Sequence, residues 1–499
     1  MESTESRRDE SATAAAVGRL VGVAYRWLRV LTVVVWLGVG LFSQFQPVRV
    51  VPYTVGLVGT AIGLTLTMAL LEDSDGPESR SRRVDNRSGS RSTVDRLLLT
   101  GCLLAMGIGT RGVVSAAGGI TASQPTFAPS AIIVAVLVLG ALFALVGRWF
   151  GPVTAGVAVV GIGVGWLAAP PSVSLVETMV YDSRGLYGPL TRGAVSWIAP
   201  ACLLTGLWRA GRTVDRLRAL GPTVTGTTGW LTGRRLGRGL WKLTPPSMGF
   251  VALLMAWLST EASYSRVIGV AAVPAALCWT ALFVGGRLGG LPVRVERPDP
   301  AVGWRAWTGP LLTAGGPLAL MAVLLVGSGL PVGAVLAAGA VLLVGVCLIG
   351  GWFGFVATTN GTEQSGLRGG VETVLDGSVV GMRLFARAAV LLAVVGGITA
   401  LLGAGGLSTE LLAALVALTG GSSVPVGLAV VVAAAALGVV LPPLAGYATA
   451  AVVIVPLVRT LTPVAELTAH LVVWYAVVGG WLVAPAVDRR LRELIARGR

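Results

Sequence analysis

Charged side chains are scarce in this chain. Only 12% of its 499 residues are Asp, Glu, Lys or Arg, whereas soluble proteins carry about 25%. So few charges cannot cover a surface that faces water, which excludes a soluble globular protein. The hydrophobic residues, 54% of the chain, form long uniform runs and not the short alternating segments of a membrane β-barrel. The composition therefore predicts an all-α polytopic membrane protein.

Groups that perform enzyme chemistry are equally scarce. The chain has one histidine, His470, which excludes a multi-histidine metal site and a zinc protease of the HExxH type. With Trp474 four residues later, His470 is interpreted as an interior, hydrogen-bonded histidine. The cysteines form no CxxC pair and are interpreted as packing residues; they are Cys102, Cys202, Cys278 and Cys347. We therefore expect no enzyme, no organic cofactor and no metal site built from side chains.

The net charge of +15 has two possible meanings. In a soluble protein it would suggest nucleic acid as a partner. Here the arginines cluster between apolar runs, notably in 209–242, 287–305 and the C-terminal tail, and short basic segments of this kind remain in the cytoplasm. We therefore predict no nucleic-acid binding and a multi-pass protein of the cell (plasma) membrane with both termini in the cytoplasm.

The apolar runs predict about 13 or 14 transmembrane helices, since a span needs about 20 apolar residues. The expected spans are 27–44, 50–71, 97–113, 128–148, 151–169, 188–208, 246–260, 264–286, 310–329, 331–357, 383–404, 424–441, 446–460 and 464–485. The apolar segment 407–419 is too short to span and is predicted to be an arm or a re-entrant piece. The loop 72–96 mixes acids, arginines and serines and is predicted to be a disordered linker.

One apolar run contains a strong helix break. Within Gly438–Tyr447 the adjacent Pro442 and Pro443 remove two backbone donors. Such a break persists in a bilayer only where protein or a watery cavity surrounds it, and transporters place ions and substrates at such breaks. Pro245–Gly249 and Gly396–Thr399 offer similar interruptions. The alternative for each is a kinked helix without a ligand. The candidate binding residues are Leu441, Pro442, Pro443, Gly446, Tyr447, Pro245, Pro246, Met248, Gly396, Gly397 and Thr399.

These segments resemble the membrane permeases of TRAP transporters, especially those with fused small and large membrane subunits. Gly438–Tyr447, which reads GVVLPPLAGY, is similar to the family's G-M-G-L-P-T-T-A-A-Y. Ala469–Tyr475, AHLVVWY, is similar to the A-H-L-F-V-F-Y that follows it, and Pro245–Gly249, PPSMG, to P-P-V-M-G. Upstream, Ala389–Gly421 resembles a glycine-interrupted helix followed by a short arm, and Tyr181–Gly211 resembles the first core helices of the large subunit.

The resemblance implies an organisation in three parts. Residues 1–26 form a polar and basic N-terminal tail. Residues 27–120, with the loop 72–96, are similar to the small subunit. Residues 127–499 are similar to the large permease, shortened at 212–244 and at the C-terminus.

The resemblance also implies an activity. Such permeases are elevator-type secondary transporters that receive a small organic anion, a carboxylate, from an extracytoplasmic solute-binding protein and couple its import to Na⁺. The shortened segment 212–244 lacks the family's first re-entrant hairpin, and Val440 and Pro443 replace a glycine and a threonine of its motif. These departures favour an alternative, a non-transporting structural or assembly protein of the membrane with a permease-like fold.

Overall fold

The structure is a computed structural model. It describes residues 2–36, 50–72, 89–117, 129–170, 178–179, 185–186, 195–211, 223–225, 266–267, 269–277, 280, 294–296, 304–327, 330–352, 367–420, 422–462 and 464–497. The chain divides into two compact units. Unit 1 comprises Met1–Leu145, Ile198–Arg216 and Arg305–Ala389, and unit 2 comprises Val146–Trp197, Leu217–Trp304 and Val390–Arg499.

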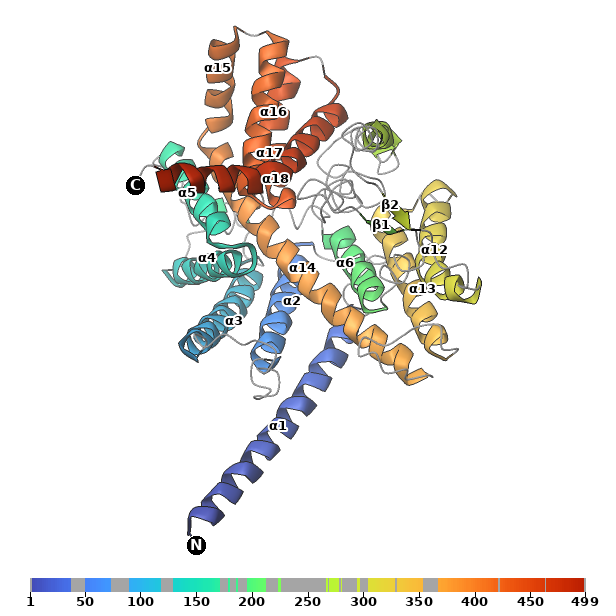
Figure 1. The fold of residues 1–499 in the computed structure, drawn as a ribbon. Helices are drawn as coiled ribbons and strands as arrows, with labels where there is room; N and C mark the ends of the chain where they lie inside the picture. Colours follow the sequence, from blue (N-terminus) through green and yellow to red (C-terminus); the bar gives the residue numbers. More distant parts are fainter. Residues whose placement is uncertain are drawn as a thin grey trace. The chain divides into compact units, whose positions relative to one another are not determined.

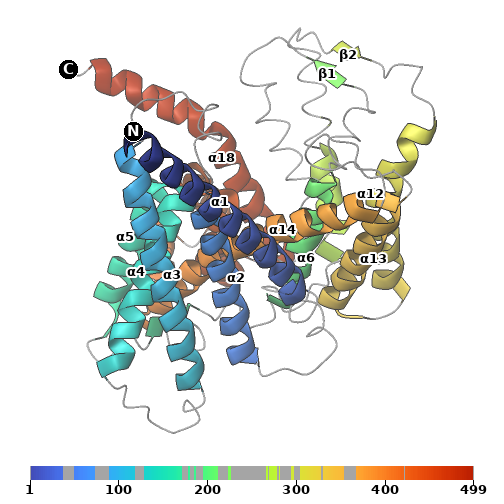
Figure 2. The same ribbon diagram turned by 90° about the horizontal axis from the view of Figure 1, so that it is seen from below.

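The elements that lie mainly in unit 1 are all helices (Figure 1). They are α1 (Glu2–Val35), α2 (Val50–Glu72), α3 (Gly89–Ala117), α4 (Pro129–Phe150), α6 (Val195–Ala210), α12 (Trp304–Gly327) and α13 (Val332–Trp352). α2 packs against α3, and α1 crosses α2, as Figure 2 shows from below. On the other side of the unit, α6 is tied to α12, because the Trp208 indole N–H donates a hydrogen bond of 2.8 Å to the carbonyl of Thr313.

Unit 2 contains α5 and the C-terminal helices. Their bounds are α5 (Pro152–Ala168), α15 (Leu407–Thr419), α16 (Ser423–Val440), α17 (Pro443–Leu461) and α18 (Glu466–Arg497). α16, α17 and α18 pack against one another, and α15 packs against α16 and α17. The 38-residue α14 (Leu367–Ala404) contributes its first part to unit 1 and its last part to unit 2.

Six helices of the described part of the chain are long and apolar enough to cross a membrane, or up to seven if the bent helix α17 counts as one span. They lie in α2, α3, α4, α13, α14 and α18. This confirms the predicted all-α polytopic membrane class. The predicted span 246–260 and the end of the predicted span 27–44 lie outside the described residues.

A pair of short strands is the one non-helical element in the described ranges. β1 (Thr223–Thr225) pairs antiparallel with β2 (Arg294–Glu296), with Thr223 opposite Glu296. The strands belong to the two basic segments 209–242 and 287–305.

Close helix packing depends on glycines at two crossings. In unit 1, a Cβ on Gly377 of α14 would lie 2.8 Å from the Cα of Leu207 in α6, and one on Gly206 would lie 2.8 Å from the Cα of Gly381. In unit 2, a Cβ on Gly480 of α18 would lie 2.7 Å from the carbonyl carbon of Ala435 in α16. Small residues thus let these helix backbones approach closely, which is how membrane helices associate without a hydrophobic driving force.

α14 begins earlier than the sequence predicted. The predicted span started at residue 383, and Glu372 and Asp376 interrupt the apolar pattern before it. The helix starts at Leu367 instead. Glu372, Asp376 and Arg383 are paired with side chains of α1 and α2, so they do not end the helix. α3 likewise begins at Gly89, inside the segment 72–96 that was predicted to be a linker.

Candidate binding site at the helix break between α16 and α17

The break predicted at the two prolines is present. α16 ends at Val440, and α17 begins at Pro443. Between them Leu441 (φ −106°, ψ 153°) is extended, and Pro442 (φ −55°, ψ 144°) has the polyproline conformation. The Leu441 N–H still donates to the carbonyl of Leu437 at 2.8 Å, and the Gly446 N–H donates to the carbonyl of Pro442 at 2.9 Å. The break therefore consists of two residues between two complete helices.

A break of this kind presents two kinds of backbone group. The last carbonyls of α16 have no partner within the helix, and the first N–H groups of α17 have none either. The carbonyl end carries partial negative charge, which suits a cation, and the N–H end carries partial positive charge, which suits an anion. Pro443 at the first helical position fixes this start, since its missing N–H costs nothing there.

The break is held in place by apolar packing within unit 2. Leu441 and Ala445 are buried against Leu391 of α14, and this core is extended by partly buried hydrophobic residues, Phe150, Val157, Leu437 and Leu444. Gly446 lies close to α18, because a Cβ there would be 3.0 Å from a methyl carbon of Val477. The sequence positions Leu441–Tyr447 are therefore a rigid, mostly buried segment.

A cluster of polar aromatic side chains lies behind the break. The buried Tyr447 hydroxyl and the Nδ1 atom of His470 are hydrogen-bonded at 2.9 Å, which confirms His470 as an interior, hydrogen-bonded residue. Trp474 packs edge-on against Tyr447 with ring centroids 5.6 Å apart. The Trp474 side chain is 2% exposed, and its Nε1 donor is buried without a hydrogen-bond partner among the described residues. A buried N–H of this kind requires an acceptor, which can be a water molecule, a bound ligand or another part of the chain.

The second predicted interruption, Gly396–Thr399, lies within the helix α14. Thr399 donates from Oγ1 to the carbonyl of Gly396 at 2.9 Å. A Cβ on Gly397 would contact Met179 and Leu186. The break packs against a different residue of α14, Leu391, which comes earlier in the helix. The remaining predicted site residues, Pro245, Pro246 and Met248, lie outside the described residues.

An apolar cavity of about 310 Å³ lies elsewhere in unit 2. It is formed by the start of α16, the end of α17 and the start of α18, and so lies at the helix ends remote from the break. Its lining residues are Val424, Gly427, Val430, Val458, Thr462, Val464, Ala469 and Val472. Such a lining offers a carboxylate little beyond the Thr462 hydroxyl, so the break is the better candidate for an anion.

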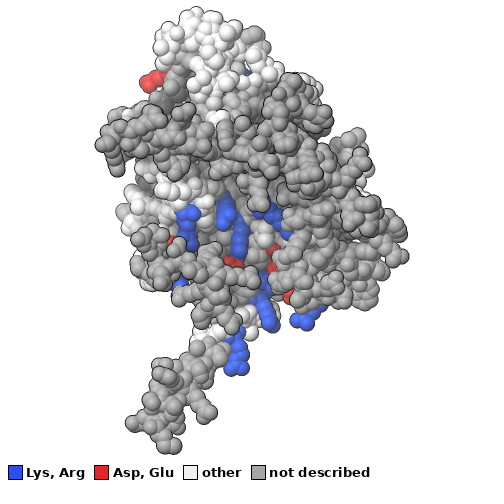
Figure 3. Space-filling model, viewed as in Figure 1, with Lys and Arg blue, Asp and Glu red and all other residues white. Residues whose placement is uncertain are grey.

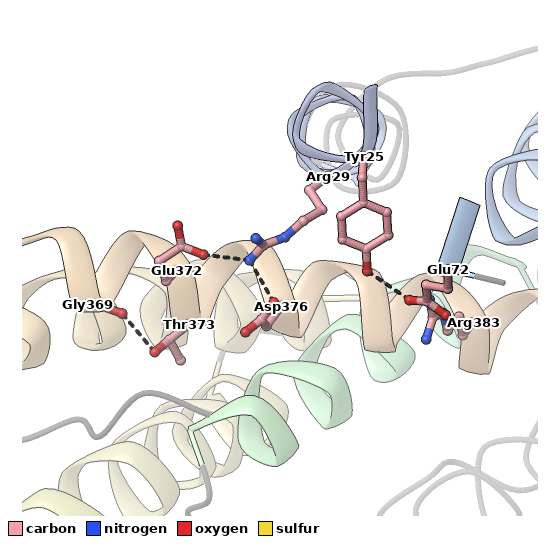
Figure 4. A network of polar contacts seen from close by, with 8 residues as sticks. All are labelled: Tyr25, Arg29, Glu72, Gly369, Glu372, Thr373, Asp376 and Arg383. Carbon is pink, nitrogen blue, oxygen red and sulfur yellow. Dashed lines mark hydrogen bonds and ion pairs between the residues drawn. The ribbon is translucent and has the colours of Figure 1, made fainter. Parts of the chain in front are cut away.

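Sequence reasoning missed a polar network in unit 1, which Figure 4 shows. The Arg29 guanidinium of α1 points at α14, where its Nη2 atom lies 2.7 Å from Glu372 Oε2 and 2.6 Å from Asp376 Oδ1. The Tyr25 hydroxyl donates to Glu72 Oε1 of α2 at 2.9 Å, and Arg383 pairs with the same carboxylate. A local signal exists, since Glu372 and Asp376 are four residues apart and share one helix face.

The tyrosine of this network remains protonated over the ordinary pH range. Burial, and then the hydrogen bond to Glu72, raise the pKa of Tyr25 to about 12. The pKa in the folded state is above the ordinary value of about 10. The stabilising contribution of Tyr25 is therefore complete at a pH below about 10. It is lost only as the pH rises through about 12.

Replacing Arg29 with glutamine is expected to lower the free energy of unfolding by about 1–2 kcal/mol. Removing the guanidinium leaves the carboxylates of Glu372 and Asp376 facing each other. Because both are partly exposed, the loss of stability is smaller than it would be for a fully buried pair. Thermal unfolding in detergent measures it, with Arg368→Gln at the exposed start of α14 as the control. The same Arg29 change in a Glu372→Gln, Asp376→Asn background should cost nothing, and an equal cost there would contradict the ion pairing.

One comparison with known proteins gives a match. Residues 239–486 match the model of the family described as tripartite ATP-independent periplasmic transporter, DctM component. No curated protein and no solved structure matches the chain. The matched region runs from before α12 into α18 and includes the break, Tyr447, His470 and Trp474. Through residues 239–486 the chain belongs to the DctM family, the large permease components of TRAP transporters.

Proposed function

We propose that this TRAP-type permease imports a small organic anion, a carboxylate, together with Na⁺, and receives it from an extracytoplasmic solute-binding protein. The observation that carries the proposal is the break at Leu441–Pro442, with the unused Trp474 N–H buried behind it. The family match supports the class of transporter. Binding of an anion and of Na⁺ follows from the two helix ends that meet at the break. The start of α17 offers N–H donors, and the end of α16 offers carbonyl acceptors.

The buried aromatic cluster gives the site its means of recognising a carboxylate. The Trp474 N–H is a donor without a partner among the described residues, and a hydrogen bond from such a donor to a charged acceptor contributes about 1.5–3 kcal/mol. The Tyr447–His470 hydrogen bond holds the neighbouring rings in place. In this proposal, N–H groups of the first turn of α17 supply the remaining donors to the anion.

Trp474→Phe tests the proposal, because it keeps the ring that packs on Tyr447 and deletes only the N–H. We expect the apparent KM for the carboxylate to rise about tenfold or more, while the melting temperature stays unchanged or rises, since an unsatisfied buried donor is removed. The measurement is Na⁺-driven uptake of radiolabelled carboxylates by proteoliposomes supplied with a cognate solute-binding protein. Trp166→Phe, at a 56% exposed tryptophan of α5, is the matched control.

Two results would count against the proposal. Unchanged uptake kinetics with a lower melting temperature in Trp474→Phe would make the indole purely structural. Absence of Na⁺-dependent uptake by the unmodified protein, over a broad panel of carboxylates and binding proteins, would favour the alternative. The chain would then be a non-transporting structural or assembly protein that retains the permease fold, as its shortened segment 212–244 suggests.

A further inference from the structure

The outward face of α1 carries a continuous apolar stripe. Its side chains are 41–70% exposed although they are hydrophobic, and they are Val17, Leu20, Val23, Trp27, Val30, Leu31 and Val34. Leu20, Trp27 and Val34 recur every seven residues and so follow one line along the helix. Such a face, which no described residue covers, is a surface for contact with lipid or with another protein.

The opposite face of α1 is already occupied. Tyr25 and Arg29 point at α2 and α14 (Figure 4). The indole N–H of Trp36, which follows α1, donates to the carbonyl of Ser378 at 3.0 Å. The network therefore fixes the rotation of α1 about its axis and keeps the apolar stripe turned away from unit 1. Figure 1 shows the N-terminal half of α1 extending beyond α2 and α14.

Basic side chains border the stripe. Arg19 and Arg26 are both exposed, and each precedes a central stripe residue by one position, which places it about 100° around the helix. Neither makes an ion pair with the described residues. Figure 3 shows that basic side chains predominate over acidic ones on the described surface in that view. Positive charge beside an apolar stripe with a central tryptophan is complementary to anionic lipid headgroups above acyl chains.

We propose that α1 lies along the membrane surface and binds anionic phospholipid, with the stripe at the boundary of headgroups and acyl chains and Arg19 and Arg26 on the phosphates. Within the described residues α1 is not apolar enough to span, and this placement departs from the predicted span 27–44, whose end lies outside these residues. The lipid is chosen over a second copy of the chain because the arginines beside the stripe are not neutralised by acids on that face among the described residues. The inference does not depend on whether the chain transports a carboxylate.

Retention of phospholipid by the purified protein tests the role of Arg19 and Arg26. The purified full-length protein, delipidated and titrated with phosphatidylglycerol or phosphatidylcholine, is examined by native mass spectrometry. Because an arginine near an anionic surface contributes about fivefold in affinity, the Arg19→Gln, Arg26→Gln variant should retain phosphatidylglycerol roughly 25-fold less well, with phosphatidylcholine unaffected. Arg111→Gln, at an exposed arginine of α3, is the control. Equal retention by both variants would overturn the proposal.

Fluorescence quenching tests the position of the stripe. A bimane label is placed at residue 20, 27 or 34, or at the exposed Gly18 on the opposite face, in protein without native cysteines and reconstituted in vesicles. Brominated lipid should quench the three stripe positions, and aqueous iodide should quench residue 18. Three other results would overturn the proposal. Lipid quenching at all four positions would make α1 a span, iodide quenching of the stripe would make it water-facing, and protection from both quenchers would make it covered by protein.

Discussion

Replacing Gly480 with valine is expected to destabilise the protein by about 3 kcal/mol or more, the upper end of the cost of overpacking. The backbones of α18 and α16 are in contact there, since even a single added carbon on Gly480 would lie 2.7 Å from the carbonyl carbon of Ala435. Backbone atoms inside a helix cannot move aside as a flexible side chain can. The two helices would separate and carry the Leu441–Pro442 break with them, so thermal stability in detergent should fall.

The next residue along supplies a matched control. Gly479 lies in the same helix and has nothing within 4 Å of an added Cβ. Gly479→Val changes helix propensity in the same way, and slightly favourably, because glycine is the weaker helix former. Its melting temperature should therefore match or exceed that of the unmodified protein. Equal destabilisation by the two substitutions would show that the crossing of α16 and α18 is not tight at Gly480.

Gly377→Val is expected to have an effect of similar size in unit 1. A Cβ at Gly377 would lie 2.8 Å from the Cα of Leu207, so α14 would be forced off α6. The contact is reciprocal, since Gly206 of α6 fits against Gly377 and Gly381 of α14. Moving either helix away would therefore also break the contact made by the glycine of the other helix. We expect a loss of about 3 kcal/mol, which thermal unfolding or the yield of monodisperse protein would reveal.

Gly345→Val provides the comparison for this substitution. Gly345 lies in α13 of the same unit and has nothing within 4 Å of an added Cβ, so valine there should be tolerated. Retention of the unmodified melting temperature by Gly377→Val would refute the tight crossing of α6 and α14. A fall in Gly345→Val as large as that in Gly377→Val would show that valine itself, and not the clash, is harmful.

Helices whose ends are marked by glycine or proline could be predicted from the sequence. The short segment 407–419 coincides with α15, which is bounded by Gly406 (φ 65°) and Gly420 (φ 60°). Both glycines adopt a left-handed backbone conformation that other residues rarely tolerate. The break at Leu441–Pro442 was equally predictable, because two consecutive prolines end a helix and start the next one wherever they occur.

Features that depend on distant partners could not be predicted. Arg29 pairs with Glu372 and Asp376 across 343 and 347 residues, and nothing near these acids in sequence indicates that a cation neutralises them. They therefore resembled a loop before the span at 383. Likewise, Tyr447 and His470 are 23 residues apart on different helices, and only the packing of α17 on α18 places them together.

The length of α14 has a mechanical consequence. Its 38 residues give a rod of about 57 Å, far longer than the hydrocarbon core of about 30 Å. The uncharged part, Ala388–Ala404, covers about 25 Å, and the part just before it carries Arg383 and Arg387. Drawing the rod inward by one or two turns would bring these two arginines toward hydrocarbon first, at a cost of several kcal/mol for each charge left without a partner. The charged first part of α14 therefore limits how far this helix can slide across the bilayer.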